Sequence, residues 1–79
     1  MPAQIIDKDA LLKKLAATLK SIRKEKGISQ EKLAETSRLS REYVGRLERD
    51  NANVSILTLC QICNALEVKP SEILTRVKL

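Results

Sequence analysis

One local pattern of residues occurs five times in this chain of 79 residues, and it predicts five helices. In each copy, a residue that can begin a helix follows one apolar residue and precedes a second apolar residue by four positions. This is the spacing of a hydrophobic staple, in which two apolar side chains meet around the first turn of a helix. The apolar pairs are Ile6 with Leu11, Ile28 with Leu33, Leu39 with Val44, Val54 with Leu59, and Val68 with Ile73.

The residue between the members of each pair supports the same prediction. These residues are Asp7, Ser29, Ser40, Ser55 and Lys69. The first four can accept a hydrogen bond from a free amide of the first turn, whereas Lys69 cannot and is followed by Pro70, which suits the first helical position. We therefore expect an all-α fold with helices at about 8–26, 30–36, 41–49, 56–66 and 70–77.

The chain has no internal repeat and no long linker rich in proline or glycine, which favours one domain spanning residues 1–79. We expect residues 1–6 to be a flexible arm. Gly27 follows the first helix and can end it in a left-handed conformation. Because a domain of this size buries few apolar side chains, a partner subunit is expected to cover part of its apolar surface.

Composition narrows the classes of function. The chain carries a formal charge of +5, no histidine and one tyrosine. Without histidine the commonest general base and metal ligand is missing, and we expect neither an enzyme nor a metal or other cofactor. One aromatic side chain offers little for stacking of unpaired bases, so duplex DNA is the favoured acidic partner. With no signal-like start and no apolar run of roughly 18 residues, we expect a cytoplasmic protein without a membrane partner.

The fourth predicted helix is expected to turn five residues toward the core: Ile56, Leu59, Ile62, Cys63 and Leu66. Two cysteines form a C-x-x-C motif at Cys60 and Cys63, inside the apolar pattern of this helix. With no second cysteine pair, one chain cannot assemble a closed zinc site from them. We interpret both as small buried hydrophobic residues. A thiol oxidoreductase, or a metal site shared between subunits, remains the alternative.

Residues 30–48 read as two short helices joined by a tight turn at residues 37–39. Of the six arginines in the chain, four lie in this segment or directly after it: Arg38, Arg41, Arg46 and Arg49. At 100° per residue, Tyr43, Val44 and Leu47 cluster on one side of the second helix and are expected to face the core. The opposite side is then rich in arginine, the geometry of a helix that inserts into the major groove.

We expect that outward side to read bases. Arginine can donate two hydrogen bonds to guanine, and glutamate can accept one from cytosine, so Arg41, Glu42 and Arg46 are the candidate base readers. Gly45 lies among them and is also expected to face outward. It lowers helix stability by about 1 kcal/mol relative to alanine, which is easier to understand if this surface closely approaches a ligand.

Other polar residues near the two helices are candidates for phosphate contacts, which set register without reading sequence. Gln30 lies at the first position of a helix, where free amides attract anions. An ordinary solvent-facing residue is the alternative for Gln30. The full set of candidate phosphate ligands is Gln30, Arg38, Tyr43, Arg49, Asn51 and Asn53.

Glu48 needs a different role, because phosphate repels a carboxylate. Its angular position is beside the packed face of the helix, and we predict a structural ion pair with Arg23 of the first helix. An exposed glutamate of little energetic consequence is the alternative.

The chain resembles the helix-turn-helix family of phage lambda-type and Xre-like repressors over about residues 15–74. Two runs carry the resemblance: ISQEKLAETSRLSREYVGRLER and SILTLCQICNALEVKPSEIL. It implies a compact five-helix lambda-repressor-like domain that binds operator DNA as a dimer. Arg38 departs from the family, which usually has glycine there for a left-handed backbone. Asp50 and Asn51 replace the family's common glycine and basic residue.

Within that family the stretch RLERDNANVSILTLCQICNALEV looks most like the controller proteins of restriction-modification systems. The resemblance implies a homodimer on a palindromic operator, with RNA polymerase as a further candidate partner. Apolar residues beyond the needs of one small core are the candidate dimer interface: Leu57, Cys60, Ile73, Leu74 and Val77. The alternative is an antitoxin or phage-type repressor whose fourth and fifth helices bind another protein.

Overall fold

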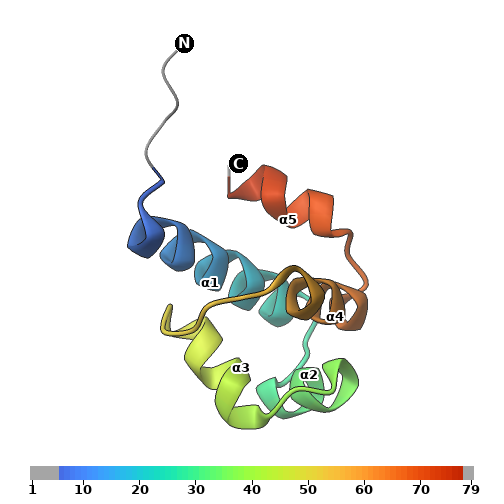
Figure 1. Cartoon of the computed structure of the whole chain (residues 1–79). Coiled ribbons are helices and arrows are strands. Elements are labelled where there is room, and N and C mark those ends of the chain that lie inside the picture. The colour runs from blue at the N-terminus through green and yellow to red at the C-terminus, as the bar shows by residue number, and fades with distance from the viewer. Residues whose placement is uncertain (1–5, 78–79) are drawn as a thin grey trace.

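The computed structural model describes residues 6–77 and contains five helices and no strand in that range (Figure 1). Most of the predicted N-terminal arm lies outside the described residues. The all-α prediction is confirmed, and each predicted helix end lies within one residue of the observed one. The helices are α1 (Lys8–Glu25), α2 (Gln30–Ser37), α3 (Arg41–Glu48), α4 (Ile56–Leu66) and α5 (Pro70–Arg76).

The helix starts follow the predicted capping pattern. Ser29, Ser40 and Ser55 each accept a hydrogen bond at 3.0 Å from the backbone amide three residues later, and Asp7 accepts one at 3.2 Å. Lys69 makes no side-chain cap, and Pro70 occupies the first turn of α5 instead. Four of the five starts therefore satisfy an otherwise free amide through the residue that the sequence indicated.

Four helix ends share one backbone arrangement, in which a left-handed residue is followed by an amide that bonds five residues back. The left-handed residues are Gly27, Arg38, Asp50 and Glu67, with φ between 56° and 67°. The next amide in each case donates to a carbonyl at 2.9–3.1 Å, as in a Schellman motif. Arg38 keeps the conformation for which the family uses glycine, at a cost of order 1 kcal/mol for a side chain with a Cβ.

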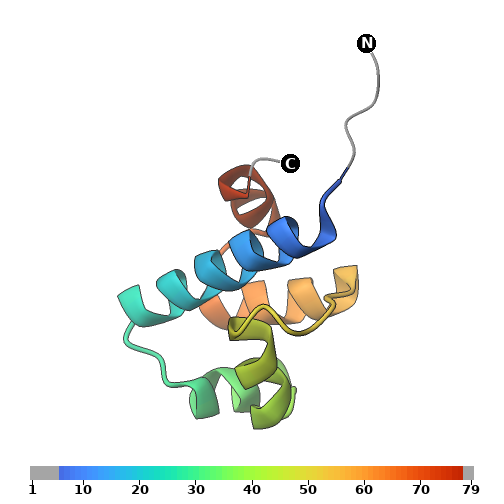
Figure 2. The same cartoon turned by 90° about the vertical axis from the view of Figure 1, so that its left-hand side faces the viewer.

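The core lies where α1 and α4 meet the other helices. α1 packs against α3 on one side and α5 on the other, while α4 packs against α2 and α5 (Figures 1 and 2). The largest fully buried side chains come from all five helices: Leu19, Ile22, Leu33, Val44, Ile62, Cys63, Leu66 and Ile73. Across residues 6–77, none of the helices is both long and apolar enough to cross a membrane.

The structure corrects two predictions about α5. Ile73 and Val77 were expected in a dimer interface, but they are 0% and 3% exposed within this one chain. Leu74 is half-buried. The reason is that α5 lies against both α1 and α4, so its apolar stripe completes the chain's own core.

Two predictions about α4 are also wrong. Ile56 was expected in the core but is 74% exposed, and Cys60 was expected to be buried but is exposed. The stripe of Leu59 and Cys63 is buried. One turn earlier, Ile56 borders an apolar groove between α1 and α5 rather than packed side chains. Burial raises the pKa of the Cys63 thiol to about 11, so the thiolate, the reactive form of cysteine, is scarce at neutral pH.

The position of Ile73 gives a direct test of the core. Replacing Ile73 with alanine should lower the free energy of unfolding by about 2–5 kcal/mol, because a fully buried side chain leaves a cavity. The measurement is urea denaturation at a concentration where the wild type is monomeric. Leu57→Ala is the matched control, since Leu57 is 71% exposed and its loss should change the value by less than about 0.5 kcal/mol. Similar losses in both variants would contradict this account of the core.

Candidate nucleic-acid interface

A buried ion pair fixes α3 against α1. Arg23 Nε donates to Glu48 Oε2 at 2.6 Å and Arg23 Nη2 donates to Glu48 Oε1 at 3.0 Å, so the pair is bidentate. The two residues are 8% and 9% exposed. Arg23 Nη1 also donates to the Ile28 carbonyl oxygen at 2.7 Å, which ties in the connection before α2. The predicted ion pair is present, and it is buried rather than exposed.

Gln30 joins the same cluster. Its Nε2 donates to Glu48 Oε1 at 2.8 Å, so the first residue of α2 is tied to the last residue of α3. An amide nitrogen carries two hydrogens, and the second remains available to an outside acceptor. The phosphate contact of Gln30 stays a prediction, and the bond to Glu48 is a structural role that the sequence pattern did not indicate.

Hydrogen bonds and charge set the ionisation of Glu48. Burial alone would raise the pKa of this carboxyl group. Hydrogen bonds from Arg23 and Gln30, together with the charges of Arg23 and Lys20, outweigh burial and hold the pKa of Glu48 below its usual value of 4.5. Glu48 is therefore ionised at neutral pH. Its carboxylate accepts three hydrogen bonds, from Arg23 Nε, Arg23 Nη2 and Gln30 Nε2.

Tyr43 is used inside the protein. Its hydroxyl group donates to the Asn53 carbonyl oxygen at 2.6 Å, which fastens the loop after α3, and burial raises the pKa of Tyr43 although the charge of Arg46 opposes this. The Arg46 guanidinium carbon lies 5.9 Å from the centre of the tyrosine ring, within the range of a cation–π contact. To contact a phosphate, Tyr43 must give up the bond to Asn53, since a hydroxyl group has one proton to donate.

The outward side of α3 carries the polar residues that the helical angle indicated. Arg41, Glu42 and Arg46 are exposed, while Val44 and Leu47 are 0% and 2% exposed. The helix thus separates a packed face from a polar face. α3 and α2 lie together at the end of the molecule opposite α5 (Figure 1).

Gly45 lies on the outward side of α3, as expected, but it is buried. A Cβ at this position would lie 3.2 Å from Arg41 Nη1 and 3.4 Å from Arg49 Nη1. No other group outside the backbone of α3 and the two chain neighbours of Gly45 lies within 4 Å of that point. Gly45 therefore points away from the core, and two arginine side chains cover it. Arg49, predicted to contact phosphate at the far end of α3, reaches back toward the middle of the helix.

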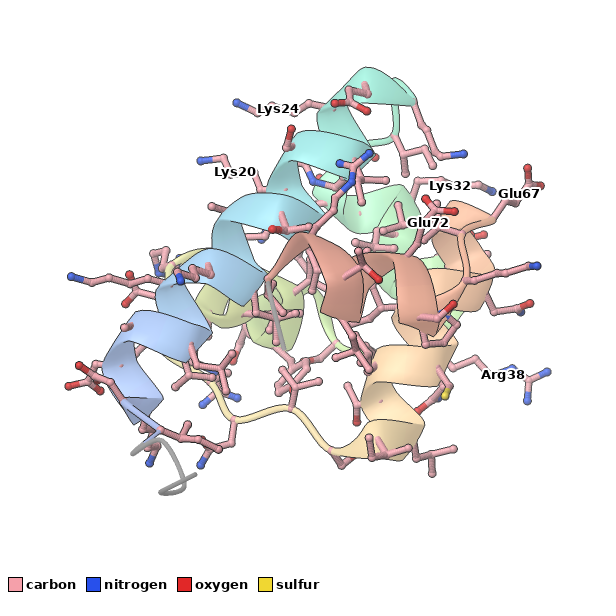
Figure 3. The ribbon with its side chains drawn as sticks, turned by 90° about the horizontal axis from the view of Figure 1, so that it is seen from above. Lys20, Lys24, Lys32, Arg38, Glu67 and Glu72 are labelled. Carbon is pink, nitrogen blue, oxygen red and sulfur yellow. The ribbon has the colours of Figure 1, made fainter. Side chains whose placement is uncertain are left out.

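The remaining candidate phosphate ligands lie at the edges of the motif. Arg38, in the turn between α2 and α3, is exposed, and its side chain projects away from the body of the molecule (Figure 3). Asn51 and Asn53 are exposed in the loop after α3. Their roles stay predictions.

A second contact that the sequence did not indicate holds the turn of the motif. Gln61 Nε2 in α4 donates to the Ser37 carbonyl oxygen at 3.1 Å, and the Ser37 hydroxyl group donates to the Leu33 carbonyl oxygen at 2.6 Å. A polar residue between the apolar positions of α4 gives no sign of such a partner 24 residues away. The contact became visible only once α4 was placed beside α2.

The buried ion pair predicts how stability depends on pH. Glu48→Gln should lower the free energy of unfolding by about 3–5 kcal/mol near neutral pH, because Arg23 then stays buried without a countercharge. The folded-state pKa of Glu48 is depressed below 4.5, so its stabilisation is present above that value and is lost as the pH falls through the folded-state pKa. The difference in the free energy of unfolding between the wild type and Glu48→Gln, measured by urea denaturation, should therefore be smaller at about pH 3 than near neutral pH.

A matched control separates this effect from general acid destabilisation. Glu35 is an exposed glutamate of α2 that pairs only with Lys32, at 3.8 Å. Glu35→Gln should change stability by less than about 1 kcal/mol at either pH. A loss in Glu48→Gln that is the same at both pH values would contradict the assigned role of the ionised carboxylate.

Comparison with known proteins agrees with this geometry. The helix-turn-helix family model matches residues 19–73. Control protein C.SmaI of Serratia marcescens is 42% identical over 62 residues, which are 78% of this chain and 74% of that protein. The immunity repressor of Bacillus phage phi105 is 44% identical over 55 residues, or 70% of this chain and 38% of the repressor.

Solved structures give the same result. The restriction-modification controller protein C.AhdI from Aeromonas hydrophila is 42% identical with a TM-score of 0.77, covering 78% of this chain and 94% of that one. The controller protein C.Esp1396I, solved as a tetramer with its natural 35-base-pair operator, is 39% identical with a TM-score of 0.79, covering 85% and 88%. The resemblance seen in the sequence is confirmed. The chain belongs to the helix-turn-helix family of DNA-binding transcriptional regulators, in the Xre-like group that includes the restriction-modification controller proteins.

Proposed function

We propose that α3 enters the major groove of duplex DNA and that Arg41, Glu42 and Arg46 read base edges there. The main support is that these side chains are exposed on a helix whose other face is buried and is held in place by the Arg23–Glu48 ion pair. A rigidly held helix can offer its donors and acceptors in fixed positions, which base recognition requires. No catalytic role is assigned to this site.

Phosphate contacts on either side of α3 complete the proposed interface. Gln30 presents its second amide hydrogen at the N-terminus of α2, where the free amides also favour an anion. Arg38 projects outward from the turn, and Asn51 and Asn53 are exposed after α3. These positions flank the proposed base readers, as the two phosphate strands flank a groove.

A second copy of the chain is the proposed partner on the α4 face. Leu57 is 71% exposed and Cys60, one helical turn later, is also exposed. Ile56, the neighbour of Leu57 in the chain, lines an apolar groove of about 180 Å³ whose other lining residues come from α1, the loop before α4, α4 itself and α5. Both copies of the chain carry Leu57 and the groove. Two copies related by a twofold axis can therefore each cover the apolar side chains of the other. Leu74 and Val77 contribute as lining residues of the groove rather than as exposed contacts.

The relatives support control of a restriction-modification system as the biological role. C.SmaI is named a control protein, and C.AhdI and C.Esp1396I are named restriction-modification controller proteins. Transcriptional control at a palindromic operator, with RNA polymerase as a further partner, fits that role. The phage phi105 repressor covers the same domain, so a phage-type repressor, or an antitoxin that binds another protein, is the competing role.

The variant Arg46→Ala tests whether Arg46 reads a base pair. Arg46→Ala should weaken binding to the preferred duplex by about 1–3 kcal/mol and should relax the preference at one base pair. The measurement is selection of bound duplexes from a random pool, followed by affinity measurement on single-base variants of the selected site. Arg38→Ala is the control, expected to weaken all duplexes alike. Equal losses on all sequences for Arg46→Ala would reject its role as a base reader.

The proposed dimer is tested at Leu57. Leu57→Glu should shift the chain to a monomer in analytical ultracentrifugation, because a buried charge without a partner disfavours an apolar interface. Binding to a palindrome with half-sites one DNA turn apart, about 34 Å, should weaken while the monomer keeps its fold. A wild-type chain that is monomeric at high micromolar concentration with and without DNA would exclude the homodimer. Co-purification of a different protein in stoichiometric amount would then support the competing role.

A further inference from the structure

Arg41 and Arg49 converge on a single point of the outward face of α3. Arg41 belongs to the first turn of the helix and Arg49 is its C-terminal cap, eight positions later. Their Nη1 atoms nevertheless lie 3.2 and 3.4 Å from the same position, where a Cβ of Gly45 would be. Arg49 therefore runs back along the helix, and Arg41 runs forward to meet it.

Nothing within the described part of the chain neutralises this pair. The salt bridges of residues 6–77 join Arg23 to Glu48 and Lys32 to Glu35, so no carboxylate of those residues lies within 4.0 Å of either guanidinium group. Like charges held close together repel, and a group with acceptor atoms placed between or beside them removes that repulsion. The arrangement is therefore suited to an electronegative ligand.

The position of the pair along α3 selects the kind of acceptor. In a helix-turn-helix complex the N-terminal part of the recognition helix contacts base edges, and phosphates are contacted by flanking residues. The Arg49 guanidinium group lies beside that of Arg41, near the middle of the helix. With α3 inserted in the groove as proposed, that position is directed toward the floor of the groove rather than toward the phosphates beyond the helix end. Guanine presents two acceptors, O6 and N7, to a guanidinium group in the major groove.

We infer that Arg49 is a specificity-determining residue that acts together with Arg41 on neighbouring guanines, and that Gly45 permits this by leaving the helix surface open beneath both side chains. This inference rests on the proposed insertion of α3 into the major groove. It changes the role of Arg49 from a phosphate ligand to a base reader. It also gives a reason for a glycine inside a short helix, where alanine would favour helix formation.

The first test compares Arg49→Ala with Arg49→Lys in the full chain, on the duplex selected by the wild type from a random pool. Arg49→Ala should weaken binding about 5- to 150-fold, the range for one bidentate base contact. It should relax the preference at a base pair next to the one relaxed by Arg41→Ala. Arg49→Lys keeps the charge but loses the planar fork of donors, so it should keep the salt dependence of binding and lose much of the base preference.

The second test uses Gly45→Ala. A Cβ at 3.2 Å from Arg41 Nη1 must shift that guanidinium group by a few tenths of an ångström and comes into contact with Arg49 Nη1 at 3.4 Å. Both groups are flexible ends, so the fold is not expected to suffer. Helix propensity should raise Tm by a few degrees while affinity for the selected duplex falls several-fold. In the double variant Arg41→Ala with Arg49→Ala, adding Gly45→Ala should leave affinity unchanged. The double variant itself should lose less affinity than the product of the two single losses.

Several outcomes overturn the inference. An Arg49→Ala variant that weakens all duplexes alike and lowers the salt slope by about 1 assigns Arg49 to a phosphate. If the losses of affinity in Arg41→Ala and Arg49→Ala multiply in the double variant, the two arginines do not act together on the duplex. An unchanged affinity in Gly45→Ala rejects their joint action as well. In these cases the reader role of Arg46 stands on its own measurement. A wild-type chain without preference among duplexes removes the proposed function and this inference together.

Discussion

The Arg23–Glu48 ion pair is the interaction on which the position of α3 depends. Burying two charges costs several kcal/mol unless the geometry is good and the remaining hydrogen-bonding groups are satisfied. Here the bidentate pair, the Ile28 carbonyl group and the Gln30 amide provide those bonds. A helix of eight residues is too short to be stable alone, so α3 relies on this cluster and on its apolar face. The same carboxylate orients Gln30, which links the placement of α3 to the first turn of α2.

In three of the short connections between helices, a single apolar residue takes part in both the end of one helix and the start of the next. The amides of Ile28, Leu39 and Val68 each donate to a carbonyl five residues back and close one helix. The same three residues precede the caps Ser29, Ser40 and Lys69, so each is the first apolar residue of the next helix start. Ending one helix and beginning the next around one partly buried side chain that packs against the core leaves little freedom in the angle between the two helices. This helps to hold the five helices of residues 8–76 in a defined arrangement.

The properties that the sequence predicted well are those set by residues close together in the chain. Helix starts, the left-handed Gly27 and the angular separation of Val44 from Arg46 follow from spacings of a few residues. The left-handed backbone at Arg38 was indicated by the family resemblance instead. The Arg23–Glu48 pair was also predictable, because an acidic residue beside a packed face needs a cation from the helix underneath. Ile56, Cys60, Ile73 and Val77 were misplaced because burial at the rim of α4 and on α5 depends on where helices distant in sequence end. Gly45 was placed on the correct side of α3, but its burial was missed because helical angle ignores long side chains that fold over the helix.

Arginine takes opposite roles on the two sides of α3. Arg23, under the helix, donates hydrogen bonds to the Glu48 carboxylate and to the Ile28 carbonyl oxygen, and these bonds hold α3 against α1. Arg41 and Arg49, above it, meet over Gly45 with no carboxylate of residues 6–77 within 4.0 Å. Since the inner and outer faces of α3 share no side chain in these two tasks, outward residues can change without disturbing the core. The ion pair therefore sets where the helix lies, and the outward residues are the ones proposed to decide which bases it accepts.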